Sequence, residues 1–172
     1  FDFLGRPLNS PHDILTLIEI NLHFLILIKI DYKDSEKFVK AIDFLEELLG
    51  IEVFIKIFPI LLTDREPIFQ DFQKIEFNEK TGVKRTSIFY CDPYNGSQKG
   101  CDENMNGQLR LYFPKGKDFK DVTQEYLNTV QDNINERKIL SLAGYSPKEA
   151  FIKTFGEKIY LYLSYHYVHQ KH

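Results

Sequence analysis

Two apolar runs that follow each other closely constrain the fold of this chain more than any other feature. Asp13–Ile20 and His23–Ile30 are rich in leucine and β-branched residues, and Asn21 lies between them. Such residues favour strands, and the short interval favours a tight turn, so we predict an antiparallel hairpin. Phe1–Leu4 alternates like a short strand, and a breaker-rich loop at 5–11 follows it. The sequence therefore predicts three strands in a row.

A helix and a further strand are predicted after the hairpin. Asp34 or Ser35 can cap a helix whose apolar residues repeat at helical spacing, and Gly50 lies where such a helix commonly ends. The run 51–63 is almost entirely apolar, so we expect its last part, up to Thr63, to form a fully buried central strand.

The second half of the chain is predicted to be mainly helical. Residues 65–86 are polar and irregular, with a turn expected at 80–82, and the β-prone Ser87–Cys91 is predicted to be a short buried strand. Helices are predicted at about 97–112, from Asp121 or Thr123, and from Ser146, where Pro147 and Glu149 complete a capping-box pattern. This order of elements predicts an α/β fold with a mixed five-stranded sheet flanked by helices.

Length and charge limit the possible functions. The chain has 172 residues and 43% hydrophobic content, enough for one domain with a proper core. Its net charge of −3 gives no general attraction to a polyanion, so nucleic-acid contacts must come from local basic clusters at Lys84-Arg85, Lys99 and 115–120. Its two cysteines lack metal-finger spacing, which favours a cytosolic protein. Charged residues interrupt the apolar run 14–30, so we expect no membrane span.

The helix predicted at 97–112 presents an acid on its polar face. Three apolar residues form a stripe along it: Met105, Leu109 and Tyr112. At about 100° per residue, Glu103 falls nearly opposite that stripe. The same polar face carries the basic or amide side chains of Lys99, Asn106 and Arg110. A solvated helix face and a substrate-facing acid are both compatible with this pattern.

Several short motifs follow one another within Phe89–Phe119. They are Gln98-Lys99-Gly100, Glu103-Asn104, Asn106-Gly107 and Phe113-Pro114-Lys115-Gly116-Lys117-Asp118-Phe119. Together they resemble the end of the catalytic domain of bacterial insertion-sequence transposases of the DDE class, in particular the insertion-sequence-thirty family. Upstream, Leu62-Thr63-Asp64-Arg65 resembles the family element with the second catalytic aspartate, and Phe1–Gly5 the strand with the first. Leu15–Glu19 resembles the strand after it.

The resemblance implies a fold, a reaction and a metal site. The fold would be ribonuclease-H-like, with which the predicted order of elements is compatible. The chain would be an enzyme that cleaves DNA at insertion-sequence ends and transfers the freed strand to target DNA. Asp2, Asp64 and Glu103 would be its catalytic acids and would bind two Mg²⁺ or Mn²⁺ ions, since such hard cations prefer oxygen ligands.

The resemblance also suggests where partners bind. We predict DNA contacts, with transposon ends and target, by Lys99, Asn104, Asn106, Arg110, Lys115 and Lys117. Residues 1–155 would form an integrase-type catalytic core, and 156–172 a C-terminal tail to which we assign no role. We expect a homo-oligomer at full length, in a bacterial cytoplasm and associated with the nucleoid.

The sequence departs from the family pattern beside Asp64. Relatives usually continue Gly-Ser-Glu-Phe after that element, whereas this chain has Glu66-Pro67-Ile68-Phe69. Proline stiffens the loop, and Glu66 adds negative charge. Two alternatives therefore stay open: a catalytically inactive remnant that folds and binds DNA or a partner subunit, and a nuclease of the same fold that does not transfer strands.

Overall fold

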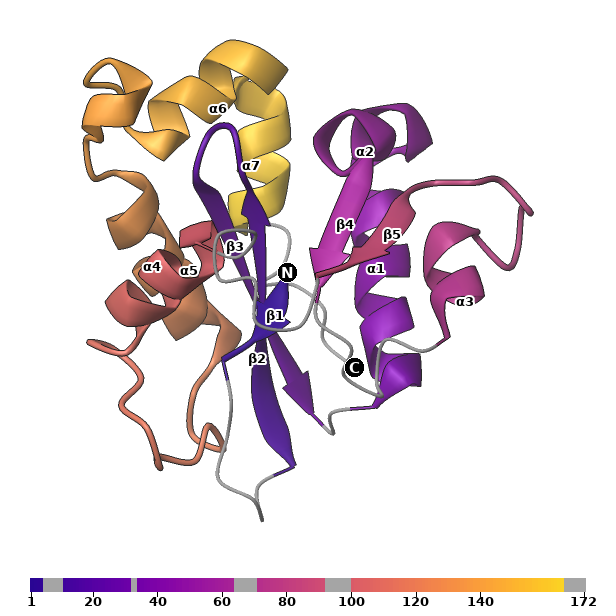
Figure 1. Cartoon of the computed structure of the whole chain (residues 1–172), viewed down its shortest axis with the longest axis horizontal. Helices are drawn as coiled ribbons and strands as arrows, with labels where there is room; N and C mark the ends of the chain where they lie inside the picture. The colour runs from indigo at the N-terminus through magenta and orange to yellow at the C-terminus, as the bar shows by residue number, and fades with distance from the viewer. Residues whose placement is uncertain (5–10, 32–33, 64–70, 92–99, 166–172) are drawn as a thin grey trace.

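Two small β-sheets surrounded by helices make up the protein (Figure 1). The computed structural model describes residues 1–4, 11–31, 34–63, 71–91 and 100–165, and their side chains except those of 100–103 and 165. The predicted α/β class is confirmed. Within the described part of the chain, no helix is long and apolar enough to cross a membrane.

The first sheet is antiparallel and has the strand order β1-β2-β3. Its strands are β1 (Asp2–Phe3), β2 (His12–Glu19) and β3 (Phe24–Asp31). β2 and β3 pair along their whole length, from His12 opposite Asp31 to Glu19 opposite Phe24, which confirms the predicted hairpin. β1 is much shorter and covers only Thr16 and Leu15 of β2.

The second sheet contains two parallel strands, β4 (Ile60–Thr63) and β5 (Ser87–Tyr90). The prediction of one five-stranded sheet is therefore wrong. β1 is the strand that would have to join the two sheets, and it spans only two residues. β4 and β5 are also less buried than predicted, since Ile60 is 57% exposed and Phe89 55% exposed.

Seven α-helices are found in the described residues, and α1, α4, α5 and α6 lie where the sequence predicts helices. Asp34 caps α1 through a 2.7 Å bond from the Lys37 amide, and Ser146 forms the predicted capping box. α2, α3 and α7 were not predicted, and α7 lies in the segment 156–172 that was predicted to be a tail. The helices are α1 (Ser35–Leu49), α2 (Ile51–Ile57), α3 (Phe72–Glu76), α4 (Gly100–Leu109), α5 (Gln124–Asn135), α6 (Pro147–Phe155) and α7 (Glu157–Tyr165).

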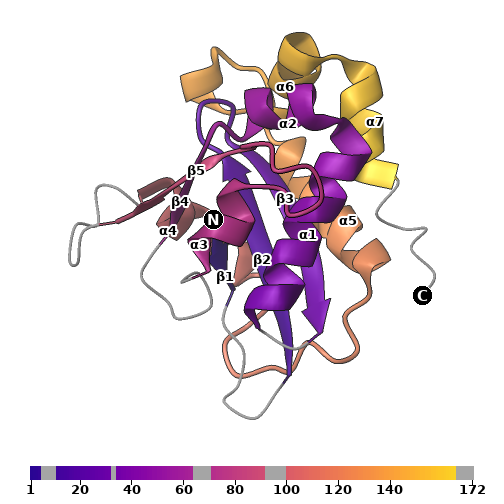
Figure 2. The same cartoon turned by 90° about the vertical axis from the view of Figure 1, so that its right-hand side faces the viewer.

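A separate hydrophobic core packs on each face of the three-stranded sheet, because successive residues of a strand point to opposite faces. Leu15 and Leu17 join the core formed with α1, α2, α6 and α7. Ile14 and Leu25 join the core formed with α4 and α5. Accordingly, α1 lies on one side of the sheet, and α4 and α5 lie on the other (Figure 1 and Figure 2).

Side-chain amides of α5 bond to the outer edge of β3, where a sheet would otherwise expose unpaired backbone groups. Asn135 accepts from the Leu25 amide at 2.9 Å and donates to the Leu25 carbonyl at 2.8 Å. Gln131, only 1% exposed, accepts from the Leu27 amide at 2.9 Å. α5 thus takes the place of a neighbouring strand along this edge.

Replacing Gln131 by methionine tests this role of α5. Methionine keeps the length of the side chain but removes the oxygen that accepts from the Leu27 amide, which would be left buried and unpaired. We expect the free energy of unfolding to fall by about 1–3 kcal/mol in urea denaturation. The exposed Asn133 on the same helix provides the control. Asn133→Ala should change stability by less than about 0.5 kcal/mol, and equal effects would contradict the proposed role.

Candidate active site

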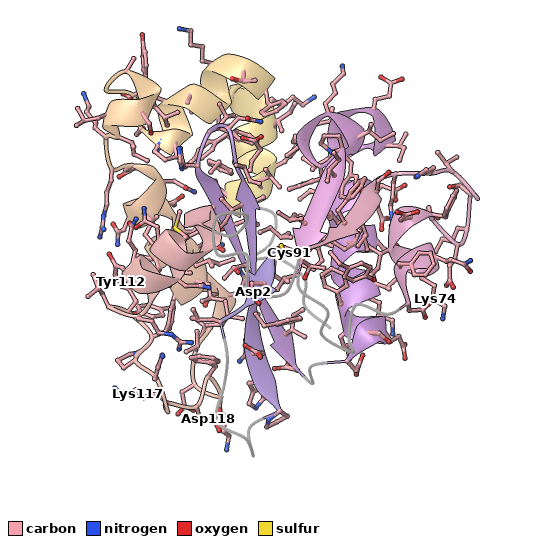
Figure 3. All side chains as sticks on the ribbon, viewed as in Figure 1. Asp2, Lys74, Cys91, Tyr112, Lys117 and Asp118 are labelled. Atoms are coloured by element: carbon pink, nitrogen blue, oxygen red, sulfur yellow. The ribbon has the colours of Figure 1, made fainter. Side chains whose placement is uncertain are left out.

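Asp2 lies in β1, between two phenylalanines that enter the core. Phe1 and Phe3 are each 6% exposed, whereas Asp2 is half-buried, which confirms the predicted alternation. The Asp2 carbonyl accepts from the Thr16 hydroxyl at 2.9 Å, and its carboxylate accepts from the Phe3 amide at 2.8 Å. The backbone that carries this acid is therefore held by its pairing with β2 (Figure 3).

The strand that leads to Asp64 lies beside the start of β1. The Phe1 nitrogen donates to the Leu62 carbonyl at 2.6 Å, and the Cys91 amide donates to the Thr63 carbonyl at 2.8 Å. β4 ends at Thr63, which is fully buried. Asp64 follows it directly in sequence and lies outside the described residues. Asp2 is the residue after Phe1, and Phe1 bonds to Leu62, which is two residues before Asp64. The strand that carries Asp2 therefore begins beside the strand that leads to Asp64.

Glu103 belongs to α4, whose backbone is helical at that position. Its side chain is among those that the structure does not describe. Met105 and Leu109, two and six positions further on, are buried in the core beside α5, as predicted. Tyr112 is partly buried and packs against the same core, and α4 ends at Leu109, three residues earlier than predicted.

The predicted metal site rests on three acids, of which Asp2 alone has a described side chain. Among the side chains that the structure describes, no group of three or more His, Cys, Asp or Glu residues could hold a metal ion. Three carboxylates are a donor set that suits Mg²⁺ or Mn²⁺, which prefer hard oxygen ligands. The metal site therefore stays a prediction.

Arg110 connects the end of α4 to the end of β1. Its guanidinium donates to the Leu4 carbonyl and, at 3.3 Å, to the Phe113 carbonyl. The element that carries Glu103 is thereby attached to the strand that carries Asp2. Sequence reasoning assigned Arg110 to DNA and missed this contact, since the sequence does not show which distant carbonyl a guanidinium will meet. Its contact with DNA stays a prediction.

The other residues predicted to contact DNA differ in accessibility. Asn104 is exposed and Asn106 half-buried, while Lys115 and Lys117 are exposed in the turn that follows α4. Figure 3 shows Lys117 on the far side of the molecule from Lys74. Lys99 lies outside the described residues. Among the predicted contacts whose side chains are described, Asn104 and the two turn lysines are therefore open to solvent.

Tyr90 lies at the end of β5, opposite Thr63. Burial of its phenol, and to a smaller extent the negative charge of Glu76, raise the pKa of Tyr90 above its ordinary value. Both effects favour the neutral form of the phenol.

Comparison with known proteins shows clear similarity to transposases. The chain is 31% identical over 148 residues to the transposase InsI for insertion sequence element IS30A of Escherichia coli, which covers 86% of this chain and 36% of that protein. It is 36% identical over 76 residues, or 44% of the chain, to the transposase for insertion sequence element IS4351 of Bacteroides fragilis.

A viral protein is also similar: the putative integrase ORF3 of a Spiroplasma virus is 33% identical over 93 residues, covering 54% of the chain and 27% of that protein. No family model matches the chain. The matched segments make up only 22% and 23% of the transposases for IS4351 and IS1086.

Proposed function

The chain belongs, by homology over most of its length, to the insertion-sequence-thirty family of transposases, and we propose that it forms the catalytic part of such an enzyme. In this proposal it cleaves DNA at insertion-sequence ends and joins the freed 3′ end to target DNA. The observation that carries the proposal is the similarity to InsI over 86% of the chain. The positions of β1, β4 and α4 support it, because Asp2, Asp64 and Glu103 belong to these elements or directly follow them.

Asp2, Asp64 and Glu103 would hold two divalent ions, Mg²⁺ or Mn²⁺. When bound, such ions would supply stabilisation of negative charge on the attacking and leaving oxygens of phosphoryl transfer. The protein supplies a rigid frame for the acids. Asp2 is in a strand paired with β2, and Arg110 attaches α4 to the end of that strand. Such support keeps catalytic groups in a fixed geometry.

Lys115 and Lys117 would contact the phosphate backbone of DNA. Replacing both by alanine should weaken binding to duplexes of any sequence alike, because phosphate contacts carry no sequence information. The slope of log affinity against log salt should fall by roughly 1 to 2, in a fluorescence-anisotropy titration at several salt concentrations. Lys80→Ala, at an exposed turn in another part of the chain, should leave the slope unchanged. An unchanged slope in the double variant would remove these lysines from the interface.

A second candidate function is a catalytically inactive remnant that folds and binds DNA. Glu66-Pro67 favours it, because these residues replace the Gly-Ser usual after the second catalytic aspartate. The chain would then keep its basic turn and lose productive metal binding. A proline fixes its own backbone angle and restricts the residue before it, which limits how the loop can adapt.

A cleavage and joining assay separates these functions. The chain is incubated with a labelled duplex that carries an insertion-sequence end, a second unlabelled duplex, and Mg²⁺ or Mn²⁺. The proposal predicts a nick at the end that disappears with a chelator, followed by transfer of the label to the second duplex. Nicking without transfer would indicate a nuclease. Binding without nicking, under conditions in which full-length InsI cleaves its own end, would support the inactive remnant.

A further inference from the structure

One leucine is far more exposed than the other apolar side chains of the described residues. Leu140 is 96% exposed, against 76% for Leu111 and 41% for Leu161. It lies in the α5–α6 loop, residues 136–146, which projects at the periphery of the molecule on the same side as α4 (Figure 1). Its apolar surface contributes nothing to the core and is available to a partner.

Backbone hydrogen bonds hold Leu140 in a fixed place within this loop. The Ile139 amide donates to the Tyr145 carbonyl, and the Gly144 amide donates to the Ile139 carbonyl, each at 3.1 Å. Between these bonds, Leu140–Leu142 form a single 3₁₀ turn. The α5–α6 loop therefore presents Leu140 on a closed, hydrogen-bonded turn.

Basic side chains accompany this turn on both of its sides. Residues 137–153 contain four basic residues and one acid, although the whole chain has a net charge of −3. Arg137, Lys138 and Lys153 are exposed. The Lys153 nitrogen lies over the ring of Tyr145, 5.0 Å from its centroid. Positive charge is therefore found both before and after the exposed turn.

The two acids closest to the turn in sequence are already bonded within the protein. Glu136 accepts from the Lys148 ammonium at 2.8 Å. Glu149 accepts from the Ser146 amide at 2.8 Å, as part of the capping box of α6. Both carboxylates are thus held by groups other than the three exposed cations, which leaves the surface of the loop positive.

Arg137 also connects the loop to the end of α4. Its guanidinium donates to the Gln108 side chain at 3.3 Å and to the Tyr112 hydroxyl at 3.1 Å. Both acceptors are neutral, so these bonds do not cancel the charge of Arg137. The exposed Lys115 and Lys117 follow Tyr112 closely in sequence. The α5–α6 loop is therefore attached to the segment that leads into the basic turn.

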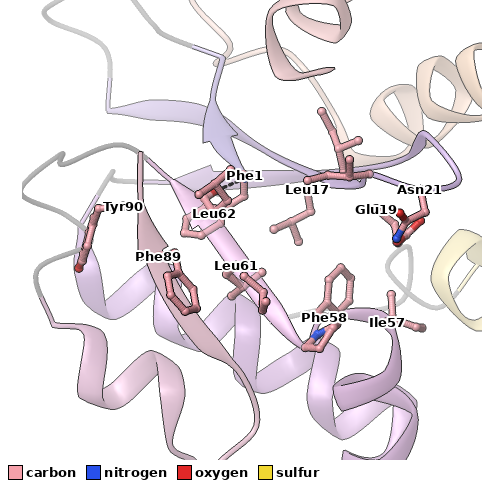
Figure 4. Close-up of a pocket in the computed structure, with 14 residues that line it drawn as sticks. Phe1, Leu17, Glu19, Asn21, Ile57, Phe58, Leu61, Leu62, Phe89 and Tyr90 are labelled. Carbon is pink, nitrogen blue, oxygen red and sulfur yellow. Dashed lines mark hydrogen bonds between the residues drawn. The ribbon is translucent and has the colours of Figure 1, made fainter. Parts of the chain in front are cut away.

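Its charge distinguishes this loop from the apolar groove between β2 and β4 (Figure 4). That groove measures about 630 Å³, and among the described residues that line it Glu19 is the charged one. A polyanion would be repelled by that acid and attracted by the cations of the α5–α6 loop.

An apolar tip between cations fits duplex DNA. Basic side chains neutralise phosphates, and leucine is one of the apolar residues that can insert between base pairs, unstack them and kink the duplex. We propose that the α5–α6 loop is a DNA-binding surface separate from the candidate active site. Leu140 inserts at a base step, and Arg137 and Lys138 contact the neighbouring phosphates. The choice of DNA as partner rests on the proposed function, but the surface includes none of the three candidate acids.

The fluorescence of 2-aminopurine tests the insertion directly, because this base fluoresces more strongly when it is unstacked. The chain is titrated, in EDTA, onto a fully paired duplex and onto the same duplex with one mismatched pair, each with 2-aminopurine beside the central step. We expect binding to the mismatched duplex to be at least about tenfold tighter, because a mismatched base is easier to unstack. Binding should also raise the fluorescence at least about twofold.

Substitutions separate the leucine from the cations. Leu140→Ala should lower the preference for the mismatched duplex below about threefold and remove the rise in fluorescence, whereas Leu140→Met, which keeps a long apolar side chain, should retain both. Leu161→Ala, at an exposed leucine of α7, is the matched control and should behave like the unmodified chain. Lys138→Ala should weaken binding to both duplexes alike and reduce the slope of log affinity against log salt by about 1.

Equal preference and equal fluorescence in Leu140→Ala and the unmodified chain would overturn the proposal, as would a lack of binding to both duplexes at low salt. A dimer in sedimentation velocity that Leu140→Ala dissociates, with unchanged DNA binding, would assign the leucine to a second copy of the chain instead. Since the assay contains no divalent ion, it does not depend on cleavage. A fluorescence rise that requires Leu140, in a chain that never cleaves, would support this surface and contradict the proposed enzymatic activity alone.

Discussion

Replacing Asp64 by asparagine is expected to lower metal-dependent cleavage of an insertion-sequence end roughly 10²- to 10³-fold, if the proposed function is correct. The amide keeps the shape of the side chain but lacks the negative charge that binds a hard divalent ion. Asp64 directly follows β4, whose pairing with β5 fixes the backbone up to Thr63. The measurement is the single-turnover rate of nicking at saturating Mg²⁺ and at saturating Mn²⁺.

Asp71→Asn is the matched control for this experiment. Asp71 is an acid beyond the same loop, and its carboxylate forms a partly exposed ion pair with Lys74 at 3.3 Å. Its replacement should change the nicking rate less than about threefold, because a surface ion pair contributes little to stability. Both variants should keep the Tm of the unmodified chain within about 2 °C. Equal nicking rates for Asp64→Asn and the unmodified chain would remove Asp64 from the proposed site.

Replacing Arg85 by methionine is expected to lower the free energy of unfolding by about 3–5 kcal/mol. The Arg85 side chain is fully buried and donates from one nitrogen to Asp43 at 2.5 Å and to Glu46 at 2.8 Å. It also donates to the carbonyls of Ile75 and Lys74, each at 2.8 Å. Its removal would leave the carboxylate of Glu46 buried without its cation, which is the main source of the expected loss.

Thermal unfolding checks this prediction. For a chain of this length, a loss of that size lowers the Tm by roughly 6–20 °C. The double variant Arg85→Met, Glu46→Met should recover much of the loss, because no charge is then left buried at that position. Arg137→Met is the control, since the exposed Arg137 bonds only weakly to Gln108 at 3.3 Å and to the Tyr112 hydroxyl at 3.1 Å. A loss below about 1 kcal/mol for Arg85→Met would contradict the account.

Arg85 also shows a limit of sequence reasoning. The pair Lys84-Arg85 was interpreted as a basic cluster available to nucleic acid, and for Arg85 this interpretation is wrong. Its partners on α1 lie about forty positions earlier in the chain, at 43 and 46. Nothing in the local pattern distinguishes an arginine that will be buried by such distant acids from one that remains in solvent.

The parts of the fold that were predicted correctly depend on local signals. The hairpin of β2 and β3 follows from two β-prone runs around Asn21, and the start of α6 from the capping residues at Ser146. α2 was missed because an apolar run such as 51–57 does not distinguish a helix from a buried strand. The division into two sheets was missed because strand pairing depends on distant segments, and the sequence does not show that β1 spans only two residues.

The candidate site was predictable to a smaller extent. The sequence placed Asp2 in a strand, Glu103 on a helix and Asp64 after a strand, and the structure agrees for each of these elements. The resemblance supplied the idea that the three acids act together. Spacing along the chain could not supply it, because convergence depends on how β1, β4 and α4 pack. The contact of Arg110 with Leu4 is one such packing detail.

A titration of the chain with Mn²⁺, followed by electron paramagnetic resonance in the presence of an insertion-sequence end duplex, tests the central claim most directly. The account predicts two bound ions per chain, and weakened binding of at least one ion in each of Asp2→Asn, Asp64→Asn and Glu103→Gln, with no change in Asp71→Asn. Binding that is unaltered in all three variants would contradict the claim that these acids form one metal site.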